Sequence, residues 1–273
     1  MATYKEINGT AVQNYAGDLP GAADGQLWYN STATNFKFQY AATAAAWSTG
    51  GNLNTGRKSL AGSGTQTAAL GFGGDTGSLS ALTESYNGSA WTEVNDLQTA
   101  RSRLAGAGTN TAALAFGGDN PTRTETEIWN GTNWTEVNNL GTGRYLLAGC
   151  GTNTAALGFG GYAPGAPTVN TETWNGTNWT EVNNLNTNRY NLSGAGTNTS
   201  AIAIGGTPAP TGNTELWNGT NWTVVNNLNT ARQAGTAAGV SNTSALFFAG
   251  YDPSPPAGGT AKTESWNGTN WTE

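Results

Sequence analysis

The sequence predicts an all-β protein, a five-bladed β-propeller of four-stranded antiparallel blades behind a short N-terminal arm. Three observations support this prediction. A unit of 43 to 45 residues occurs five times after residue 56. Each unit holds four short apolar or aromatic runs that Gly, Asn and Pro separate, which is the pattern of short strands and turns. No stretch of ten or more residues repeats apolar side chains at the spacing of a helix.

The unit is most easily followed in residues 101–143, because the other four match it closely. It opens on an arginine and passes through a small-residue run to an apolar run that ends in Gly-Gly. A strand ending in an aromatic residue, Asn-Gly, and a second aromatic strand follow. A period of this length with four strands is typical of a propeller blade. The opening arginines are Arg57, Arg101, Arg144, Arg189 and Arg232.

Within this unit we expect strand A over 104–108, strand B over 112–116, strand C over 124–129 and strand D over 134–140. Asn-Gly stands between strands C and D and predicts a hairpin with a type I′ turn, which needs φ > 0 at both central residues. Strand A contains mostly Gly, Ala, Ser and Thr, so it is expected to line the central channel, where backbones converge.

Two further residue types recur once per unit and predict the packing of the blades. Tryptophans that open strand D are expected to fill the wedge between neighbouring blades; they are Trp91, Trp134, Trp179, Trp222 and Trp271. A glutamate on strand C is expected to form a structural ion pair or a hydrogen-bonded corner with the unit arginine. These glutamates are Glu84, Glu127, Glu172, Glu215 and Glu264.

The order of arginine, Gly-Gly, aromatic residue and tryptophan resembles the kelch motif over residues 57–273. The resemblance implies a kelch-like β-propeller. The turn between strands C and D is shorter than in typical kelch blades, and Asn and Thr are unusually frequent. Kelch propellers serve many functions, so the resemblance implies a fold and leaves the function open.

The N-terminal segment breaks the repeat, and we assign residues 1–44 to an arm and 45–273 to the propeller. Alternation over 25–40 predicts a small β-hairpin in the arm. Residues 46–53 match strand D and its exit loop, so we expect this strand to complete the last blade and protect its edge. The strand that begins at Trp271 competes for the same position.

Composition excludes several functions. The chain has no His, which removes His-dependent triads and His-ligated metals, and its acids recur once per blade rather than converging on one site. We therefore expect a non-enzymatic protein with no catalytic residue, no cofactor and no metal site. Charged residues make up 10% and the net charge is −6, which argues against nucleic-acid binding. The sequence has no apolar run of the length that would predict membrane insertion. The lone Cys150 is expected to be a buried filler.

The loops between strands B and C vary in length, and with the D-to-A loops they are expected to share one face of the propeller. Such variation is typical of a recognition surface, although neutral drift in exposed loops explains it equally well. Aromatic and acidic residues here suit stacking on a sugar and hydrogen bonding to its hydroxyls. The candidate ligand-binding residues are Tyr162, Tyr251, Asp252, Asp119, Tyr145 and Tyr190.

The motif D-G-Q-L-W-Y-N-S-T over 24–32, followed by the G-N-L-N-T-G-R entry over 51–57 and the repeats, resembles virion structural proteins of tailed marine phages, especially cyanophages. The resemblance implies a virion location, on a surface appendage, the capsid or the tail, with the arm bound to other virion proteins. We expect a tail fibre or appendage component that recognises a host-surface glycan. The alternative is a structural decoration or cement protein without a ligand. Fibres are often trimeric, but no heptad or collagen-like stretch indicates a trimer here.

Overall fold

The computed structural model describes residues 14–15, 27–38, 47, 49–119, 121–254 and 258–273. The chain forms two compact units, Met1–Thr49 and Gly50–Glu273. In the first, β2 (Leu27–Asn30) and β3 (Asn35–Phe38) form an antiparallel hairpin, and β1 (Asn14–Tyr15) pairs with β2 in parallel. The Asn30 side chain accepts hydrogen bonds from two backbone N–H groups of the turn, which closes the hairpin. The hairpin predicted for the arm is confirmed.

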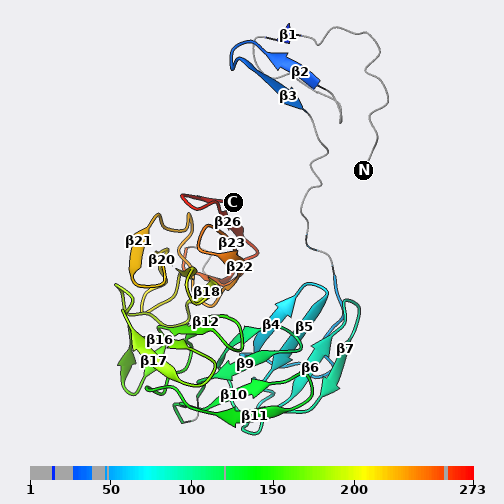
Figure 1. Cartoon of the computed structure of the whole chain (residues 1–273), viewed down its shortest axis with the longest axis vertical. Helices are drawn as coiled ribbons and strands as arrows, with labels where there is room; N and C mark the ends of the chain where they lie inside the picture. The colour runs from blue at the N-terminus through cyan, green and yellow to red at the C-terminus, as the bar shows by residue number, and fades with distance from the viewer. Residues whose placement is uncertain (1–13, 16–26, 39–46, 48, 120, 255–257) are drawn as a thin grey trace. The chain divides into compact units, whose positions relative to one another are not determined.

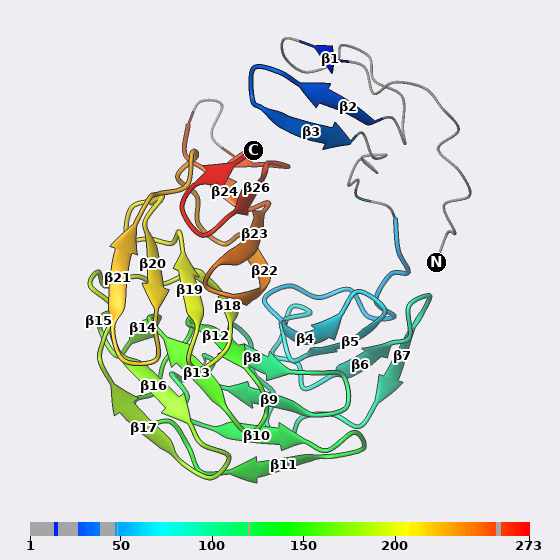
Figure 2. The same ribbon diagram turned by 45° about the horizontal axis from the view of Figure 1, so that its top comes forward.

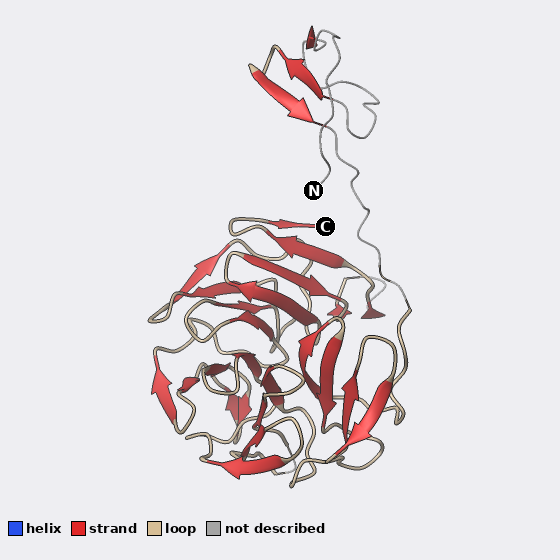
Figure 3. Cartoon of the chain, turned by 45° about the vertical axis from the view of Figure 1, so that its right-hand side comes forward, coloured by secondary structure: helices blue, strands red, loops and turns tan. Residues whose placement is uncertain are grey.

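The second unit is a five-bladed β-propeller, as the repeat predicts (Figures 1 and 3). Each blade is a four-stranded antiparallel sheet whose strands follow one another in chain order. The strands are β4 Ala61–Thr65, β5 Ala68–Phe72, β6 Thr83–Tyr86 and β7 Trp91–Val94 in blade 1; β8 Ala105–Gly108, β9 Ala113–Phe116, β10 Thr126–Trp129 and β11 Trp134–Val137 in blade 2; β12 Ala148–Gly151, β13 Ala156–Phe159, β16 Thr171–Trp174 and β17 Trp179–Val182 in blade 3; β18 Ser193–Gly196, β19 Ala201–Ile204, β20 Thr214–Trp217 and β21 Trp222–Val225 in blade 4; and β22 Thr236–Ser241, β23 Ser244–Phe248, β26 Thr263–Trp266 and β27 Trp271–Thr272 in blade 5.

The hairpin between strands C and D differs from the expected type I′ turn. In blade 3, Trp174 pairs with Trp179, and a four-residue loop joins them, closed by a hydrogen bond from Asn175 N to Asn178 O. Only Gly176 has a positive φ, of 92°. The Asn175 side chain accepts the N–H groups of the two last loop residues, so asparagine folds the loop without a left-handed conformation of its own.

Hydrophobic clusters join neighbouring blades. Between blades 1 and 2, Leu70 and Phe72 pack against Ala113, Trp129 and Trp134. The same arrangement recurs between blades 2 and 3, 3 and 4, and 4 and 5. Because the tryptophans stand between sheets, each buries a large apolar area that no single blade could bury alone. The predicted wedge role is confirmed for Trp134, Trp179, Trp222 and Trp271. Trp91 of blade 1 is half-buried and belongs to none of the described clusters between blades.

Strand A of each blade lies nearest the axis of the propeller, with β4, β8, β12, β18 and β22 side by side in that order (Figure 2). Close approach explains their small residues. A Cβ on Gly149 would stand 2.5 Å from Cζ of Phe116 in the preceding blade, which is too close for any side chain. The predicted central position of strand A is therefore confirmed.

The expectation that residues 46–53 complete the last blade is wrong. The fourth strand of blade 5 is β27, which pairs with β26 through Trp266 and Trp271, and the described residues among 46–53 form no strand. The reason is local. A four-residue loop joins β26 to β27, whereas a strand from the N-terminal side would have to close a loop of some 200 residues at a higher entropic cost.

Each unit arginine forms a buried ion pair with the strand C glutamate of its own blade, as predicted. The N–O distances are 2.6 to 3.2 Å, and the side chains are 0 to 5% exposed. In blade 3, Glu172 also accepts a hydrogen bond from Gly141 N, in the loop that leaves blade 2. The ion pair thus joins two segments of the chain: the start of one blade, where the arginine lies, and the loop that leaves the blade before it. Burial lowers the pKa of Arg144, and Glu172 opposes this shift.

Candidate functional site

The variable loops and the D-to-A loops meet on one face, as the strand order predicts. In every blade the residue that follows the unit arginine pairs with the residue that follows Gly-Gly, or Ala249-Gly250 in blade 5. The backbone contact is constant, but the side chains differ from blade to blade, which makes this paired position the variable element of the face. The pairs are Lys58–Asp75, Ser102–Asp119, Tyr145–Tyr162, Tyr190–Thr207 and Gln233–Tyr251.

Three of the predicted site residues form one aromatic cluster. The Tyr145 and Tyr162 rings, both in blade 3, lie with their centres 5.4 Å apart. Tyr162 also contacts Tyr190 of blade 4 edge-on, at 5.2 Å. All three side chains are half-buried, so each offers part of its ring to solvent and is held by its neighbours. Tyr162 lies on β14 (Tyr162–Ala163), which pairs with β15 (Ala166–Pro167) in a small hairpin.

Arg103 extends this cluster toward blade 2. Its guanidinium carbon lies 6.0 Å from the centre of the Tyr145 ring, within the range of a cation–π contact. The same guanidinium donates to Asp119 at 2.9 Å, and Ser102 Oγ donates to the other carboxylate oxygen at 2.7 Å. The predicted site residue Asp119 therefore holds Arg103 in place beside the tyrosines. The Arg103 side chain is 47% exposed.

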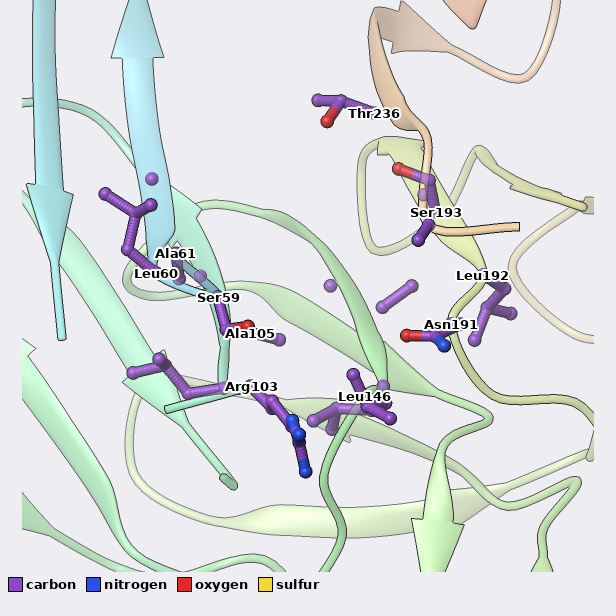
Figure 4. Close-up of a pocket in the computed structure, with 18 of the residues that line it drawn as sticks. Ser59, Leu60, Ala61, Arg103, Ala105, Leu146, Asn191, Leu192, Ser193 and Thr236 are labelled. Atoms are coloured by element: carbon purple, nitrogen blue, oxygen red, sulfur yellow. The ribbon is translucent and has the colours of Figure 1, made fainter. Parts of the chain in front are cut away.

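A cavity of about 430 Å³ opens at the axis of the propeller and is lined by residues of all five blades (Figure 4). Its rim includes the second residue after each unit arginine, and these residues share a left-handed backbone with φ of 53° to 56°. This conformation is uncommon outside glycine, and its recurrence shows that the loop geometry imposes it. The rim residues are Ser59, Arg103, Leu146, Asn191 and Ala234.

Two residues that line the cavity directly follow tyrosines of the aromatic cluster in the sequence. Leu146 follows Tyr145, and Asn191 follows Tyr190. Hydroxyl groups of Ser59, Ser193 and Thr236 supply further polar groups to the lining. The variable face therefore combines a cavity of ligand size that is lined by neutral hydrogen-bonding groups with an aromatic cluster whose Tyr145 and Tyr190 are sequence neighbours of lining residues. Sequence reasoning missed the rim residues, because the position two after the unit arginine holds five different residue types.

A second, smaller cavity of about 260 Å³ lies beneath the variable loop of blade 4. It is lined by Thr187, Arg189 and the prolines Pro208 and Pro210, among others. Thr207, which also lines it, pairs with Tyr190 of the aromatic cluster. The sequence neighbours of Tyr190 thus line both cavities, Arg189 the smaller one and Asn191 the larger one.

Tyr251 and Asp252 lie apart from the aromatic cluster, in blade 5. Tyr251 is 41% exposed, and its backbone pairs with Gln233. The Asp252 carboxylate is largely buried; it accepts the Ser254 N–H at 2.8 Å and lies 3.4 Å from Lys262 Nζ. These contacts, the backbone hydrogen bond first, hold the pKa of Asp252 below its ordinary value. No described ring contact joins Tyr251 to the tyrosines of blades 3 and 4.

Within the described residues, no group of His, Cys, Asp and Glu is arranged to hold a metal ion, and no helix is long and apolar enough to span a membrane. Cys150 is buried, and its thiol faces the Thr197 carbonyl at 3.6 Å. Burial raises the pKa of this thiol to about 12, so at neutral pH it is protonated.

No family model and no curated protein matches this chain. Its fold is shared with a solved structure described as "Structure of YjhT". The two chains superpose with a TM-score of 0.67 over 82% of this chain and 86% of that one, at 14% sequence identity. A similarity at this identity concerns the arrangement of the strands.

Proposed function

We propose that the propeller is a binding module that takes a neutral carbohydrate on its variable face, as part of a phage virion appendage. The ligand class is argued from one observation, the ring contacts that join Tyr145, Tyr162 and Tyr190 into one cluster on the variable face. Half-buried tyrosines offer a rigid ring face to the C–H groups of a pyranose and lose little conformational entropy on binding.

The chemistry of the surrounding groups favours an uncharged ligand. Arg103 is already paired with Asp119, and Asp252 with Lys262, so these charges are internally compensated. Ser59, Asn191 and Thr236 at the cavity supply hydroxyl and amide groups, which exchange hydrogen bonds with sugar hydroxyls as donors or acceptors. A neutral bacterial-surface glycan meets both conditions.

The virion location rests on the resemblance of residues 24–32 and 51–57 to phage structural proteins. In this proposal the N-terminal arm binds another virion protein, and the variable face points away from the particle. A density map of an intact particle that carries the protein would test this orientation. A map in which the Tyr162 loop is packed against a neighbouring virion protein would contradict it.

The ligand is tested by binding the full chain to an array of neutral bacterial-surface glycans and titrating the best glycan by calorimetry. Tyr162→Ala is expected to weaken binding about tenfold, the loss of one aromatic stacking contact. Tyr162→Phe keeps the ring and is expected to retain the affinity. Thr177→Ala, in the C-to-D loop of blade 3, is the matched control and leaves binding unchanged. Equal affinities of Tyr162→Ala and the parent chain would exclude this cluster as the glycan site.

One observation favours the alternative of a decoration or cement protein without a ligand. The acidic side chains that begin the variable loops, Asp75, Asp119 and Asp252, are all engaged in ion pairs within their own blades. Acidic side chains that are already paired within their own blades are less available to a ligand. Absence of any glycan binding together with a buried variable face in the particle would establish this function.

A further inference from the structure

The smaller cavity, of about 260 Å³, is lined by an arginine with one unused hydrogen-bond donor. The Arg189 side chain is fully buried. Its Nη1 atom donates to the carbonyl oxygens of Gly205 and Asn213, and its Nη2 atom donates to Glu215 at 2.9 Å. The Nε atom is buried as well, but it has no partner among the described residues. A molecule in the cavity that supplies an acceptor would satisfy this N–H, which is costly to leave unpaired. The same nitrogen is unpaired in three unit arginines that line neither cavity: Arg57, Arg101 and Arg144.

Two further polar side chains of the cavity are also available for hydrogen bonding. Thr187 and Asn213 line it, and neither side chain forms a hydrogen bond within the described part of the chain. Both are half-buried. A hydroxyl and a carboxamide can each donate and accept. The cavity therefore offers donors and acceptors to one bound molecule.

In two other blades the same positions are bonded to each other. Each counterpart of Thr187 stands two residues before the unit arginine, and each counterpart of Asn213 stands two residues before the strand C glutamate. In blade 5, Lys262 Nζ donates to Thr230 Oγ1 at 2.9 Å, and in blade 3, Asn170 Nδ2 donates to Thr142 Oγ1 at 3.5 Å. Blade 4 is thus open at a place where blades 3 and 5 use their own side chains.

The wall of the cavity is rigid and uncharged. It contains Pro208 and Pro210, whose rings fix their φ angles and which have no N–H group. The loop over 207–213 has no charged residue, and it is closed by a hydrogen bond from Thr211 N to Gly206 O at 3.0 Å. Among the described lining residues only Arg189 is charged, and its charge is balanced by the ion pair with Glu215. The cavity therefore suits a neutral ligand.

A sugar unit meets these conditions. Its hydroxyl oxygens accept from Arg189 Nε and from the Asn213 amide, and its hydroxyl hydrogens can be donated to Thr187 Oγ1. Its C–H groups can lie against the proline rings. The volume of about 260 Å³ is far larger than the roughly 15 Å³ that a single ordered water needs, so one water cannot fill the cavity.

Tyr190 connects this cavity with the aromatic cluster. Residues 187–189 line the smaller cavity, and residues 191–194 line the larger one. The Tyr190 backbone exchanges two hydrogen bonds with Thr207 of the smaller cavity, at 3.0 and 3.1 Å, and its ring contacts Tyr162 edge-on. A chain of sugars that stacks on the tyrosines can therefore continue toward blade 4.

We propose that the smaller cavity is a second sugar subsite, so that the ligand of the variable face is an oligosaccharide. This subsite rests on the proposed function, in which one sugar stacks on the cluster of Tyr145, Tyr162 and Tyr190. The next sugar unit occupies the cavity of blade 4, where Arg189, Thr187 and Asn213 bind its hydroxyl groups.

The test uses the full chain and two lengths of the best neutral glycan, its monosaccharide and its oligosaccharide, in calorimetric titrations. The parent chain is expected to bind the oligosaccharide about tenfold more tightly. Thr187→Val removes one hydroxyl at nearly constant shape, and it is expected to weaken oligosaccharide binding about three- to tenfold without changing monosaccharide binding. Thr99→Val, at the counterpart position in blade 2, lines neither cavity and is expected to change neither affinity.

The outcomes separate this subsite from the function on which it rests. Equal affinities of the parent chain for the two lengths would overturn the second subsite and leave the tyrosine site standing. An unchanged oligosaccharide affinity of Thr187→Val would do the same. If neither length binds, the proposed function and the subsite fall together.

A crystal structure of the full chain with the oligosaccharide gives a second measurement. A sugar hydroxyl is expected within hydrogen-bonding distance of Arg189 Nε. Ordered water in the cavity of the complex, with the sugar chain elsewhere, would show that the cavity holds solvent only and would overturn the subsite.

Discussion

At the scale of single residues, the buried ion pairs determine how the blades join. Arg144 has no exposed side-chain surface, and its charge is balanced by Glu172 at 2.8 Å and by the carbonyl oxygens of Gly160 and Asn170. Glu172 in turn accepts the Gly141 N–H from the preceding blade. A buried charge of this kind is stable only while its partners remain, because neither group can turn to water.

Glu172→Ala is therefore expected to destabilise the protein by about 3–5 kcal/mol, since it leaves the Arg144 charge buried without its carboxylate. Glu181 pairs with Glu172 across the same sheet but is exposed, so Glu181→Ala is the matched control and is expected to change stability by less than about 0.5 kcal/mol. Denaturant unfolding of both variants measures the difference. Similar values for the two would show that the ion pair contributes little.

At the scale of elements, the hairpins between strands C and D tie neighbouring blades together at their outer edge. Asn138, at the end of blade 2, donates to Thr177 O at 3.1 Å and to Asn178 Oδ1 at 2.8 Å, both in the loop of blade 3. The same pair of bonds occurs at the three other blade contacts. The asparagine-rich sequence of these loops therefore serves both the turn and the contact between blades.

Asn138→Ala is expected to cost about 1–2 kcal/mol, because it removes two hydrogen bonds that are accessible to water. Thr135→Ala, at an exposed position on the same strand, is the control, with an expected change below about 0.5 kcal/mol. Thermal unfolding of the two variants gives the comparison. If Asn138→Ala destabilised the protein no more than the control does, the asparagines of these loops would stabilise the turn and not the contact between blades.

At the scale of the whole molecule, the five blades are not packed equally. Blades 2, 3 and 4 contact a neighbour on both faces, whereas blades 1 and 5 each share a hydrophobic cluster with only one other described blade. In a linear array with nearest-neighbour contacts, units with one neighbour open at lower free energy than units with two.

Hydrogen exchange of backbone amides is therefore expected to be faster in β5 and β23, the second strands of blades 1 and 5, than in β13, the second strand of blade 3. The three strands are central in their own sheets, so local hydrogen bonding does not distinguish them. Mass spectrometry of exchanged peptides provides the measurement. Uniform protection across the five blades would mean that the propeller opens only as one cooperative unit.

The sequence alone determined the blades. Strands were expected at 104–108, 112–116, 124–129 and 134–140 in the second unit, and they form at 105–108, 113–116, 126–129 and 134–137. The partners of the unit arginines and the wedge position of the tryptophans followed in the same way. These features are predictable because each depends on local periodicity and is repeated five times.

Only the tertiary structure decided how the ends of the propeller are completed and which site residues meet. Local pairing of β27 replaced the strand expected from residues 46–53. Tyr162 meets Tyr190 across two neighbouring blades, a contact that no single repeat contains. Arg103 joins that cluster through a left-handed backbone that no residue preference indicates. A repeated residue determines the contact that it makes in every copy, whereas contacts between the non-repeated loop residues depend on how the copies are placed in space.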